Sequence, residues 1–281
     1  MKQHAFLAMG TDWMILAEGC GADALVQAER SVRDAEGRLS RFLPDSAVSR
    51  LNRHREARDP VLAAVLREAM GFWRDTGGAF DPRLGSQLAS LGYDRPFVEM
   101  TSPVGSWRRA DAPGLQVMLE GDRVRLEGSG SVDLGGIAKG WTVDRVLDAL
   151  VAAGAEAVLV DGGGDIAVRG ADWPIGLDDD LSVLLRDGAV ATSSTRARRW
   201  QSAQGPHAHH VLSARTGLPA ETPVDTVTVV APNATTADAL ATAALVDPAG
   251  QLPRLTGPGY QAAMRAASGA WYTTPNWCEA P

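Results

Sequence analysis

The chain is poor in cysteine, in aromatic residues and in positive charge. Its only two cysteines, Cys20 and Cys278, form no CxxC pair and no zinc-ligand pattern. This argues against a disulfide framework and against a structural zinc site. The formal net charge is −7, and proteins that bind nucleic acid usually present a basic face. We therefore expect no nucleic-acid partner.

Long apolar runs are also missing, and none approaches the roughly 20 residues that a membrane span requires. The segment 16–20 is similar to a bacterial lipoprotein cleavage site. However, Gly10 and Asp12 interrupt the apolar run before it, and Glu18 stands where such a site has a small residue. We expect a mature chain that begins at Met1, inserts into no membrane and stays in the cytoplasm.

The composition is that of a globular protein, with 45% hydrophobic and 22% charged residues. Hydrophobic periodicity and capping residues predict helices over 23–42, 46–51, 60–75, from about 138 to 153, and 233–246. Alternation and turn residues predict strands over 5–17 (two strands), 116–127 (a hairpin), 157–160, 166–169, 181–192 (two strands), 226–231 and 260–267. A long connection is expected over 94–114. Hairpins mixed with helices indicate an α+β fold with mixed, largely antiparallel sheets.

The stretch Ser131–Arg145 holds the strongest candidate for a ligand site. It predicts a strand end, a two-glycine turn and the start of a helix, with Asp133 and Lys139 on either side of the turn. Glycines allow close backbone approach, and a helix N-terminus presents free N–H groups to an anion. The alternative is a plain strand-to-helix turn with a surface lysine.

A second pair of residues is suited to a metal ion. Asp238 and Thr242 stand four residues apart on a predicted helix, so both oxygens lie on one face. Oxygen ligands are those that Mg²⁺ prefers. Alternatively, Thr235 and Asp238 form a capping box that only satisfies backbone donors.

Three further motifs carry polar or aromatic side chains suited to catalysis or binding. His209-His210 offers a general base, since imidazole titrates near neutral pH. Phe80-Asp81 offers a ring for stacking and a carboxylate for ring N–H groups. The glycine-rich segment 161–165 is either a backbone platform for a ligand or a hairpin turn. For each motif an ordinary structural role is the alternative.

The order of these motifs along the chain is specific. Met9-Gly-Thr is followed by Leu39-Ser-Arg-Phe, Gly78-Ala-Phe-Asp-Pro, Asp133-Leu-Gly-Gly-Ile-Ala-Lys-Gly, His210-Val-Leu-Ser-Ala-Arg-Thr-Gly and Ala237-Asp-Ala-Leu-Ala-Thr. This arrangement, over about residues 7–246, resembles the ApbE family of FAD:protein FMN transferases. The resemblance implies a single unit over residues 1–281, with a site between two lobes. It also implies an enzyme that uses Mg²⁺, takes FAD as substrate, and transfers FMN to a threonine or serine of a target protein, releasing AMP.

The resemblance assigns a role to each site residue. The metal would be held by Asp238, Thr242 and a backbone carbonyl near Gly136. Lys139 would face the diphosphate, and His210 would accept the proton of the target hydroxyl, so that the catalytic set is His210, Asp238 and Lys139. The expected contacts with FAD are Met9, Ala79, Phe80, Asp81, Asp133, Lys139, Thr192 and Arg215.

The chain departs from the family pattern at two places. Ser213-Ala214 stands where the family commonly has Asp-Pro, and Thr192-Ser193-Ser194 stands where it commonly has Thr-Ser-Gly. Two other functions therefore stay open. One is an FAD pyrophosphatase that gives FMN and AMP, and the other is a non-catalytic FAD-binding protein.

Overall fold

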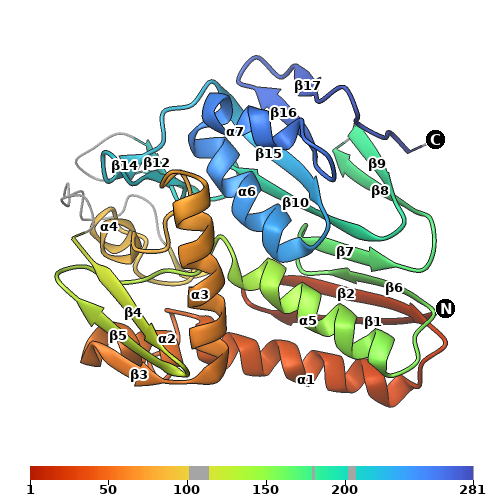
Figure 1. Ribbon diagram of the computed structural model, residues 1–281, viewed down its shortest axis with the longest axis horizontal. Helices are drawn as coiled ribbons and strands as arrows, with labels where there is room; N and C mark the ends of the chain where they lie inside the picture. Colours follow the sequence, from red (N-terminus) through yellow and green to blue (C-terminus); the bar gives the residue numbers. More distant parts are fainter. Residues whose placement is uncertain (101–113, 179–180, 202–206, 281) are drawn as a thin grey trace.

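The computed structural model describes residues 1–100, 114–178, 181–201 and 207–280. In these ranges it confirms the α+β class, with helices packed on antiparallel sheets (Figure 1). None of the described helices combines the length and apolar character needed to cross a bilayer. The helices are α1 (Ala22–Leu39), α2 (Ala47–His54), α3 (Pro60–Asp75), α4 (Gly85–Ser90), α5 (Ala138–Ala152), α6 (Ala234–Val246), α7 (Pro248–Leu255) and the 3₁₀ turn Phe97–Glu99.

The largest sheet in the described ranges has eight strands, and every pairing in it is antiparallel. Its strands, in order across the sheet, are β1 (Lys2–Ala8), β2 (Thr11–Glu18), β6 (Ala157–Asp161), β7 (Ile166–Arg169), β10 (Gly188–Ser194), β15 (Val224–Ala231), β16 (Gln261–Ala266) and β17 (Trp271–Thr273). Helices α1, α5 and α6 lie along one face (Figure 1). The opposite face packs against the hairpin β8 (Trp173–Asp178) and β9 (Leu181–Leu185). Central strands are therefore covered on both faces, which is why β6 is apolar at successive positions.

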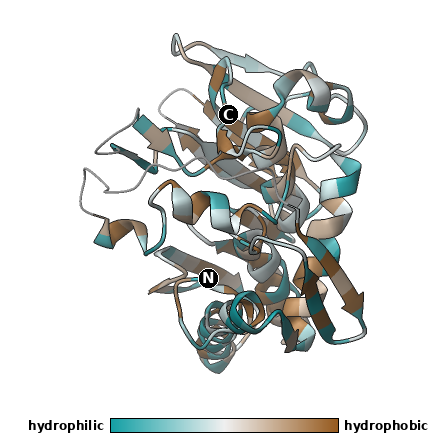
Figure 2. Cartoon of the chain, turned by 90° about the vertical axis from the view of Figure 1, so that its left-hand side faces the viewer, coloured by the Kyte–Doolittle hydropathy of each residue, from teal (hydrophilic) through white to brown (hydrophobic). Residues whose placement is uncertain are grey.

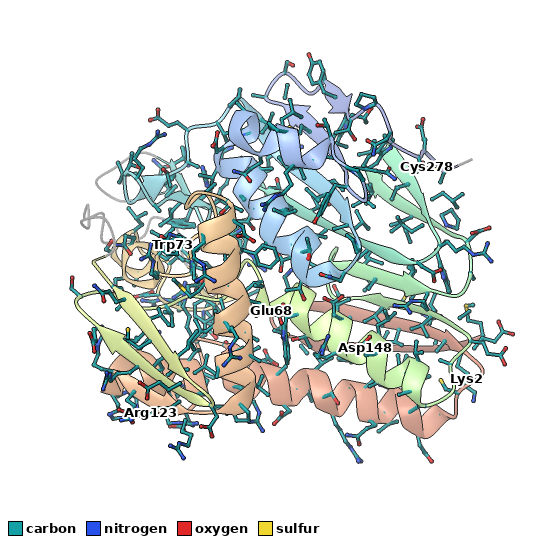
Figure 3. The ribbon with its side chains drawn as sticks, in the orientation of Figure 1. Lys2, Glu68, Trp73, Arg123, Asp148 and Cys278 are labelled. Atoms are coloured by element: carbon teal, nitrogen blue, oxygen red, sulfur yellow. The ribbon has the colours of Figure 1, made fainter. Side chains whose placement is uncertain are left out.

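A smaller layer lies beside this sheet (Figure 1). It contains α2, α3 and a three-stranded sheet of β3 (Glu56–Arg58), β5 (Arg123–Glu127) and β4 (Gln116–Glu120). Buried and exposed residues alternate along β5, as expected for a strand with one buried face. In Figure 2 hydrophobic (brown) and hydrophilic (teal) residues alternate along the hairpin of β4 and β5. Glu68 on α3 lies beside α5 (Figure 3), where its carboxylate accepts a hydrogen bond from Trp141 Nε1 at 3.2 Å. Burial raises the pKa of Glu68.

Two short hairpins and α4 complete the fold near His209 and His210, the candidate general bases. The hairpins are β11 (Arg199–Gln201) with β12 (His207–His209), and β13 (Leu212–Ser213) with β14 (Leu218–Pro219). Their buried side chains share one apolar cluster with α4, in which Trp200 donates from Nε1 to the Leu91 carbonyl at 2.8 Å. This cluster fixes the segment that carries His210.

Most predicted elements are confirmed, and the differences have local causes. Ser46 and Asp59 cap α2 and α3 through their side chains, as predicted. The first helix ends at Leu39 rather than at residue 42, and Arg41, which follows it, pairs with Asp133 and the Tyr93 carbonyl. Strands β9 and β10 do not pair with each other, since β9 pairs with β8 and β10 with β7 and β15. The residues 101–113 of the expected connection lie outside the described part of the chain.

Candidate active site

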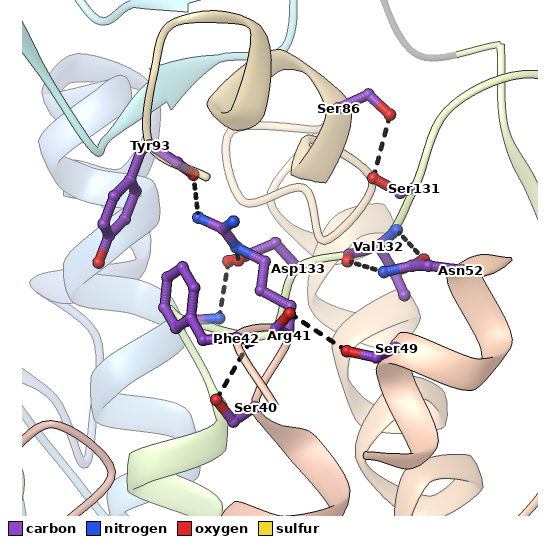
Figure 4. Close-up of polar contacts among 11 residues, drawn as sticks. Ser40, Arg41, Phe42, Ser49, Asn52, Ser86, Tyr93, Ser131, Val132 and Asp133 are labelled. Carbon is purple, nitrogen blue, oxygen red and sulfur yellow. Dashed lines mark hydrogen bonds and ion pairs between the residues drawn. The ribbon is translucent and has the colours of Figure 1, made fainter. Parts of the chain in front are cut away.

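The glycine turn before α5 is held in place by residues from the α1–α2 region. Asn52 accepts from the Val132 N–H at 2.8 Å and donates to the Val132 carbonyl at 2.9 Å (Figure 4). Asp133 accepts from the Gly135 N–H at 2.8 Å and forms an ion pair with Arg41. The turn between strand end and helix, predicted from Ser131–Arg145, is therefore present and firmly anchored.

A buried cluster of two carboxylates and one lysine lies at the start of α5. Lys139 forms an ion pair with Asp165, which follows the glycines of segment 161–165. Asp238 of α6 is 4% exposed, and its carboxylate accepts from the Gly140 N–H at 3.3 Å. Three segments far apart in the sequence thus meet at one point. Asp165 was not among the predicted site residues, because nothing in the sequence pairs it with Lys139.

The charges in this cluster influence one another strongly. Burial, and then repulsion from Asp165, raises the pKa of Asp238 to about 7, against the opposing effect of Lys139. Burial alone would lower the pKa of Lys139, but attraction to Asp165 and Asp238 outweighs it, so the pKa of Lys139 is raised. Lys139 therefore stays charged at neutral pH. Burial is the main reason that a charged Asp238 is disfavoured, so a cation bound to its carboxylate would stabilise the charged form.

One turn further along α6, Thr242 reaches the same glycine turn. A methyl group placed at Gly136 would lie 3.0 Å from Thr242 Oγ1 and 3.3 Å from the Phe80 ring, so these three residues are direct neighbours. Thr242 also shares a hydrogen bond with Ser193, with 3.1 Å between their hydroxyl oxygens. The glycine turn therefore packs against the face of α6 that carries Asp238 and Thr242. The assignment of metal ligands to these residues stays a prediction.

The capping-box alternative for Asp238 is wrong. The N-cap of α6 is Asn233, whose side chain accepts from Thr236 N. The N–H groups of Ala234 and Thr235 instead donate to the buried Asp144 of α5, at 2.7 and 2.8 Å. Since the backbone donors of α6 are satisfied without Asp238, its carboxylate is available for another partner.

His210 lies between β12 and β13, and its ring is neutral. Burial, followed by repulsion from Arg198 and His209, lowers its pKa to about 3. Its Nδ1 is buried and has no hydrogen-bond partner among the described residues. Arg198 also acts electrostatically on Asp238 and Lys139. The charge of Arg198 therefore influences both His210 and the acid–lysine cluster, an effect that no sequence motif indicated.

Four of the residues predicted to contact FAD lie in or beside one apolar cluster or in a buried ion pair. Met9, Ala79 and Phe80 pack in or against one apolar cluster with the residues that follow Asp133. Met9 has a φ of 51° in the turn between β1 and β2, and its N–H donates to Glu36 at 2.8 Å. Asp81 is buried in an ion pair with Arg83, at 2.7 Å.

The two remaining predicted contacts lie apart from the acid–lysine cluster. Thr192 shares a hydrogen bond with Thr228 on the neighbouring strand, with 2.9 Å between hydroxyl oxygens. Neighbouring side chains of a strand point to opposite faces, and it is Ser193 that faces α6. Arg215 is exposed in the turn between β13 and β14. Ser193 is thus a site residue that sequence reasoning missed, although it stood inside a quoted motif.

Gly140 offers a direct test of how tightly the site is packed. A side-chain methyl there would lie 2.9 Å from Asp238 Cβ and closer still to the Ala234 carbonyl. We expect Gly140→Ala to force α5 and α6 apart and to destabilise the fold by about 1–3 kcal/mol, as measured by urea unfolding. Gly37→Ala on the surface of α1, where nothing lies within 4 Å, is the control and should be neutral or stabilising. An unchanged midpoint for Gly140→Ala would contradict this packing.

The donor set fits a hard cation bound by few protein ligands. No group of three or more His, Cys, Asp or Glu side chains in the described ranges is arranged to hold a metal ion. The predicted set has instead one carboxylate, one hydroxyl and one carbonyl, and its carboxylate, that of Asp238, is buried. Mg²⁺ is commonly bound in this way, with water and phosphate oxygens completing its shell.

Fold and site together define an α+β protein of the ApbE type. The crystal structure of the ApbE protein from Thermotoga maritima covers 98% of this chain and 97% of its own, with a TM-score of 0.83 and 26% identity. The apo flavinyl transferase ApbE of Pseudomonas stutzeri has the same fold, with a TM-score of 0.81, 24% identity, and 98% and 95% of the two chains covered.

The chain belongs to the ApbE family, whose model matches residues 9–264. It is similar to the FAD:protein FMN transferase of Treponema pallidum (strain Nichols), with 33% identity over 79% of this chain and 71% of the relative. The enzyme of the same name from Vibrio cholerae is 30% identical over 78% of this chain and 72% of the relative. The resemblance drawn from the motif order is confirmed.

Proposed function

We propose that this protein is a Mg²⁺-dependent FAD:protein FMN transferase. In the reaction, the hydroxyl oxygen of a threonine or serine on a target protein bonds to the phosphorus of the FMN half of FAD. The pyrophosphate P–O bond breaks, AMP leaves with the bridging oxygen, and the hydroxyl proton passes to a base. Family membership and the names of the relatives support flavin transfer.

One observation carries the proposal in this chain itself. Asp238 is buried, is not needed to cap α6, and accepts one hydrogen bond of 3.3 Å from the Gly140 N–H at the start of α5. It lies one helical turn from Thr242, which packs against Gly136 of the glycine turn. A carboxylate is costly to bury unless a cation or several donors compensate it. Phosphoryl transfer requires such charge neutralisation at the reacting phosphate.

In the proposal, Asp238, Thr242 and the Gly136 carbonyl hold the metal. When bound, Mg²⁺ supplies Lewis-acid stabilisation of charge on the phosphoryl oxygens. Lys139 remains positively charged in its ion pair with Asp165, because the pKa of Lys139 is raised. Its charge would attract the diphosphate of FAD. The Gly135 and Gly136 region allows the close approach that a diphosphate needs.

His210 is proposed as the proton acceptor. Its pKa of about 3 keeps the ring neutral at pH 7, so a nitrogen lone pair is available. Arg198 contributes to that low value by repulsion. An anionic substrate beside Arg198 offsets its charge, which makes His210 a stronger base when substrate is bound than when it is absent.

The binding side of the proposal retains the predicted contacts. Met9, Ala79 and Phe80 form an apolar wall, and Asp81 and Asp133 lie at its polar edges. Thr192 and Arg215, which lie apart from the acid–lysine cluster, contact the more distant parts of FAD or the target. We further propose that the whole chain acts as one unit, with the site where the two layers meet. Cytoplasmic location stays a prediction.

The deciding experiment incubates the protein with FAD, Mg²⁺ and a protein that carries an Asp-x-x-(Ser/Thr)-Gly-Ala-(Ser/Thr) segment, the kind of target that the family resemblance implies. We expect a fluorescent target band that survives a denaturing gel and a mass increase equal to FMN minus water. In the control target, alanine replaces the threonine or serine that accepts FMN, and this target should stay unlabelled. Release of free FMN and AMP without labelling of the target would identify a pyrophosphatase. Binding of FAD without turnover would identify a flavin carrier. Either result would contradict the proposal.

A further inference from the structure

Arg41 has no role in the reaction proposed above, yet hydrogen bonds, an ion pair and aromatic rings hold its side chain. It lies between α1 and α2, and its side chain is 11% exposed. Its Nε donates to the Asp133 carboxylate, and its Nη2 donates to the Tyr93 carbonyl at 2.7 Å (Figure 4). Removing a guanidinium from water is costly, and here a carboxylate and a carbonyl satisfy it.

Aromatic rings further restrict the guanidinium. Its central carbon lies 4.2 Å from the centroid of Phe42 and 4.9 Å from that of Tyr93. Cations are attracted to ring faces at such distances. The Ser49 hydroxyl also donates to the Arg41 carbonyl at 3.1 Å, which ties the backbone to α2. Both ends of Arg41 are therefore held before any ligand is bound.

Among the described residues, the side chain of Asp133 links Arg41 to the glycine turn. One Asp133 oxygen accepts from Arg41, and the other accepts from the Gly135 N–H. The Asp133 N–H donates to the Pro82 carbonyl at 2.8 Å, which connects the turn to the segment after Phe80. Asp133 therefore bridges Arg41 and the Gly135 N–H, and each of its two carboxylate oxygens is held by one of them.

We propose that Arg41 is a positioning residue for FAD binding. By orienting Asp133, it holds the Asp133–Gly136 turn in the conformation that receives the dinucleotide before FAD arrives. The inference rests on the proposed function, because it takes FAD as the ligand of this turn. Arg41 itself touches no substrate in this arrangement.

A double-mutant cycle read by direct FAD binding tests the proposal. The intact protein, Arg41→Ala, Asp133→Ala and the double variant are titrated with FAD in Mg²⁺ by calorimetry. We expect each single variant to bind FAD about 10- to 100-fold more weakly, since a hydrogen bond to a charged group is lost. The double variant should bind no more weakly than Asp133→Ala, because Arg41 acts through Asp133. Arg41→Lys should show a partial loss, since lysine keeps the charge without the planar fork.

Arg55→Ala is the matched control. Arg55 donates to the Gly128 and Gly130 carbonyls, both at 2.7 Å, so it anchors the same connection without contacting Asp133. We expect a lower unfolding temperature and FAD affinity within about twofold, because the turn itself is untouched. If Arg41→Ala fails to fold, the FAD affinity of Arg41→Lys is compared with that of the unaltered protein instead.

Two results would overturn the role of Arg41 alone. One is unchanged FAD affinity in Arg41→Ala, and the other is an equal further loss when Arg41→Ala is added to Asp133→Ala. Absence of FAD binding by the unaltered protein would instead overturn the proposed function, and this inference with it. The two failures are thereby distinguished.

Discussion

Asp238→Asn is expected to reduce FMN transfer by at least about 10³-fold. Metal-assisted charge stabilisation contributes several kcal/mol to phosphoryl transfer, and about 4 kcal/mol corresponds to a factor of 10³. Asparagine keeps the shape of the side chain and one oxygen, but removes the charge that would hold Mg²⁺. The rate is measured as flavin transferred to the target per minute, across a Mg²⁺ titration.

Asp144→Asn is the control for burial of an aspartate in the same pair of helices. Asp144 caps α6 by accepting from Ala234 and Thr235, and burial raises its pKa. Its loss should lower the unfolding temperature, while folded protein retains transfer within a few-fold, since Asp144 lies outside the metal set. Full-rate transfer by Asp238→Asn would disprove the metal assignment.

His210→Gln is expected to slow transfer by about 10²- to 10⁴-fold, the usual contribution of a general base. Glutamine keeps a polar side chain of similar length but cannot take up a proton at neutral pH. The Michaelis constant for FAD should change little, because the proton is accepted from the target hydroxyl. The assay is single-turnover transfer to the target over a range of FAD concentrations, which gives both the maximal rate and its dependence on FAD.

The pH dependence gives an independent test of His210. A histidine with a pKa lowered to about 3 in the free enzyme is already in its base form at every pH above about 3. The kcat/KM profile of the unaltered protein should therefore show no acid limb from this group near pH 6.5, where an unperturbed histidine titrates. An acid limb near 6.5 that disappears in His210→Gln would contradict the buried, neutral ring. His209→Gln, a change at the adjacent ring, should leave transfer within a few-fold.

The secondary structure around the site was predictable because local signals agree with the tertiary structure. Asp59-Pro60 begins α3 and Ser46 begins α2, since capping depends on neighbours within three residues. The strand between Ala157 and Val160 is apolar throughout, which is sufficient to predict a buried strand. Helix α7 was missed although Asp247-Pro248 gives it the same start signal as α3, because Gly250 and Pro253 stand inside it. Strand β8 was missed as well.

The sequence by itself determined the family, the motif order, the glycine turn, and the spacing that places Asp238 and Thr242 on one face of α6. These are local or linear properties, which residue type and separation are enough to define. The tertiary structure decided which groups are partners. It paired Lys139 with Asp165 and Arg41 with Asp133, assigned the capping of α6 to Asp144 and Asn233, and surrounded His210 closely enough to lower its pKa. Pairing across tens of residues and loss of water around a charge arise only when distant segments pack together. For that reason the charge states of the site could not be predicted from the chain alone.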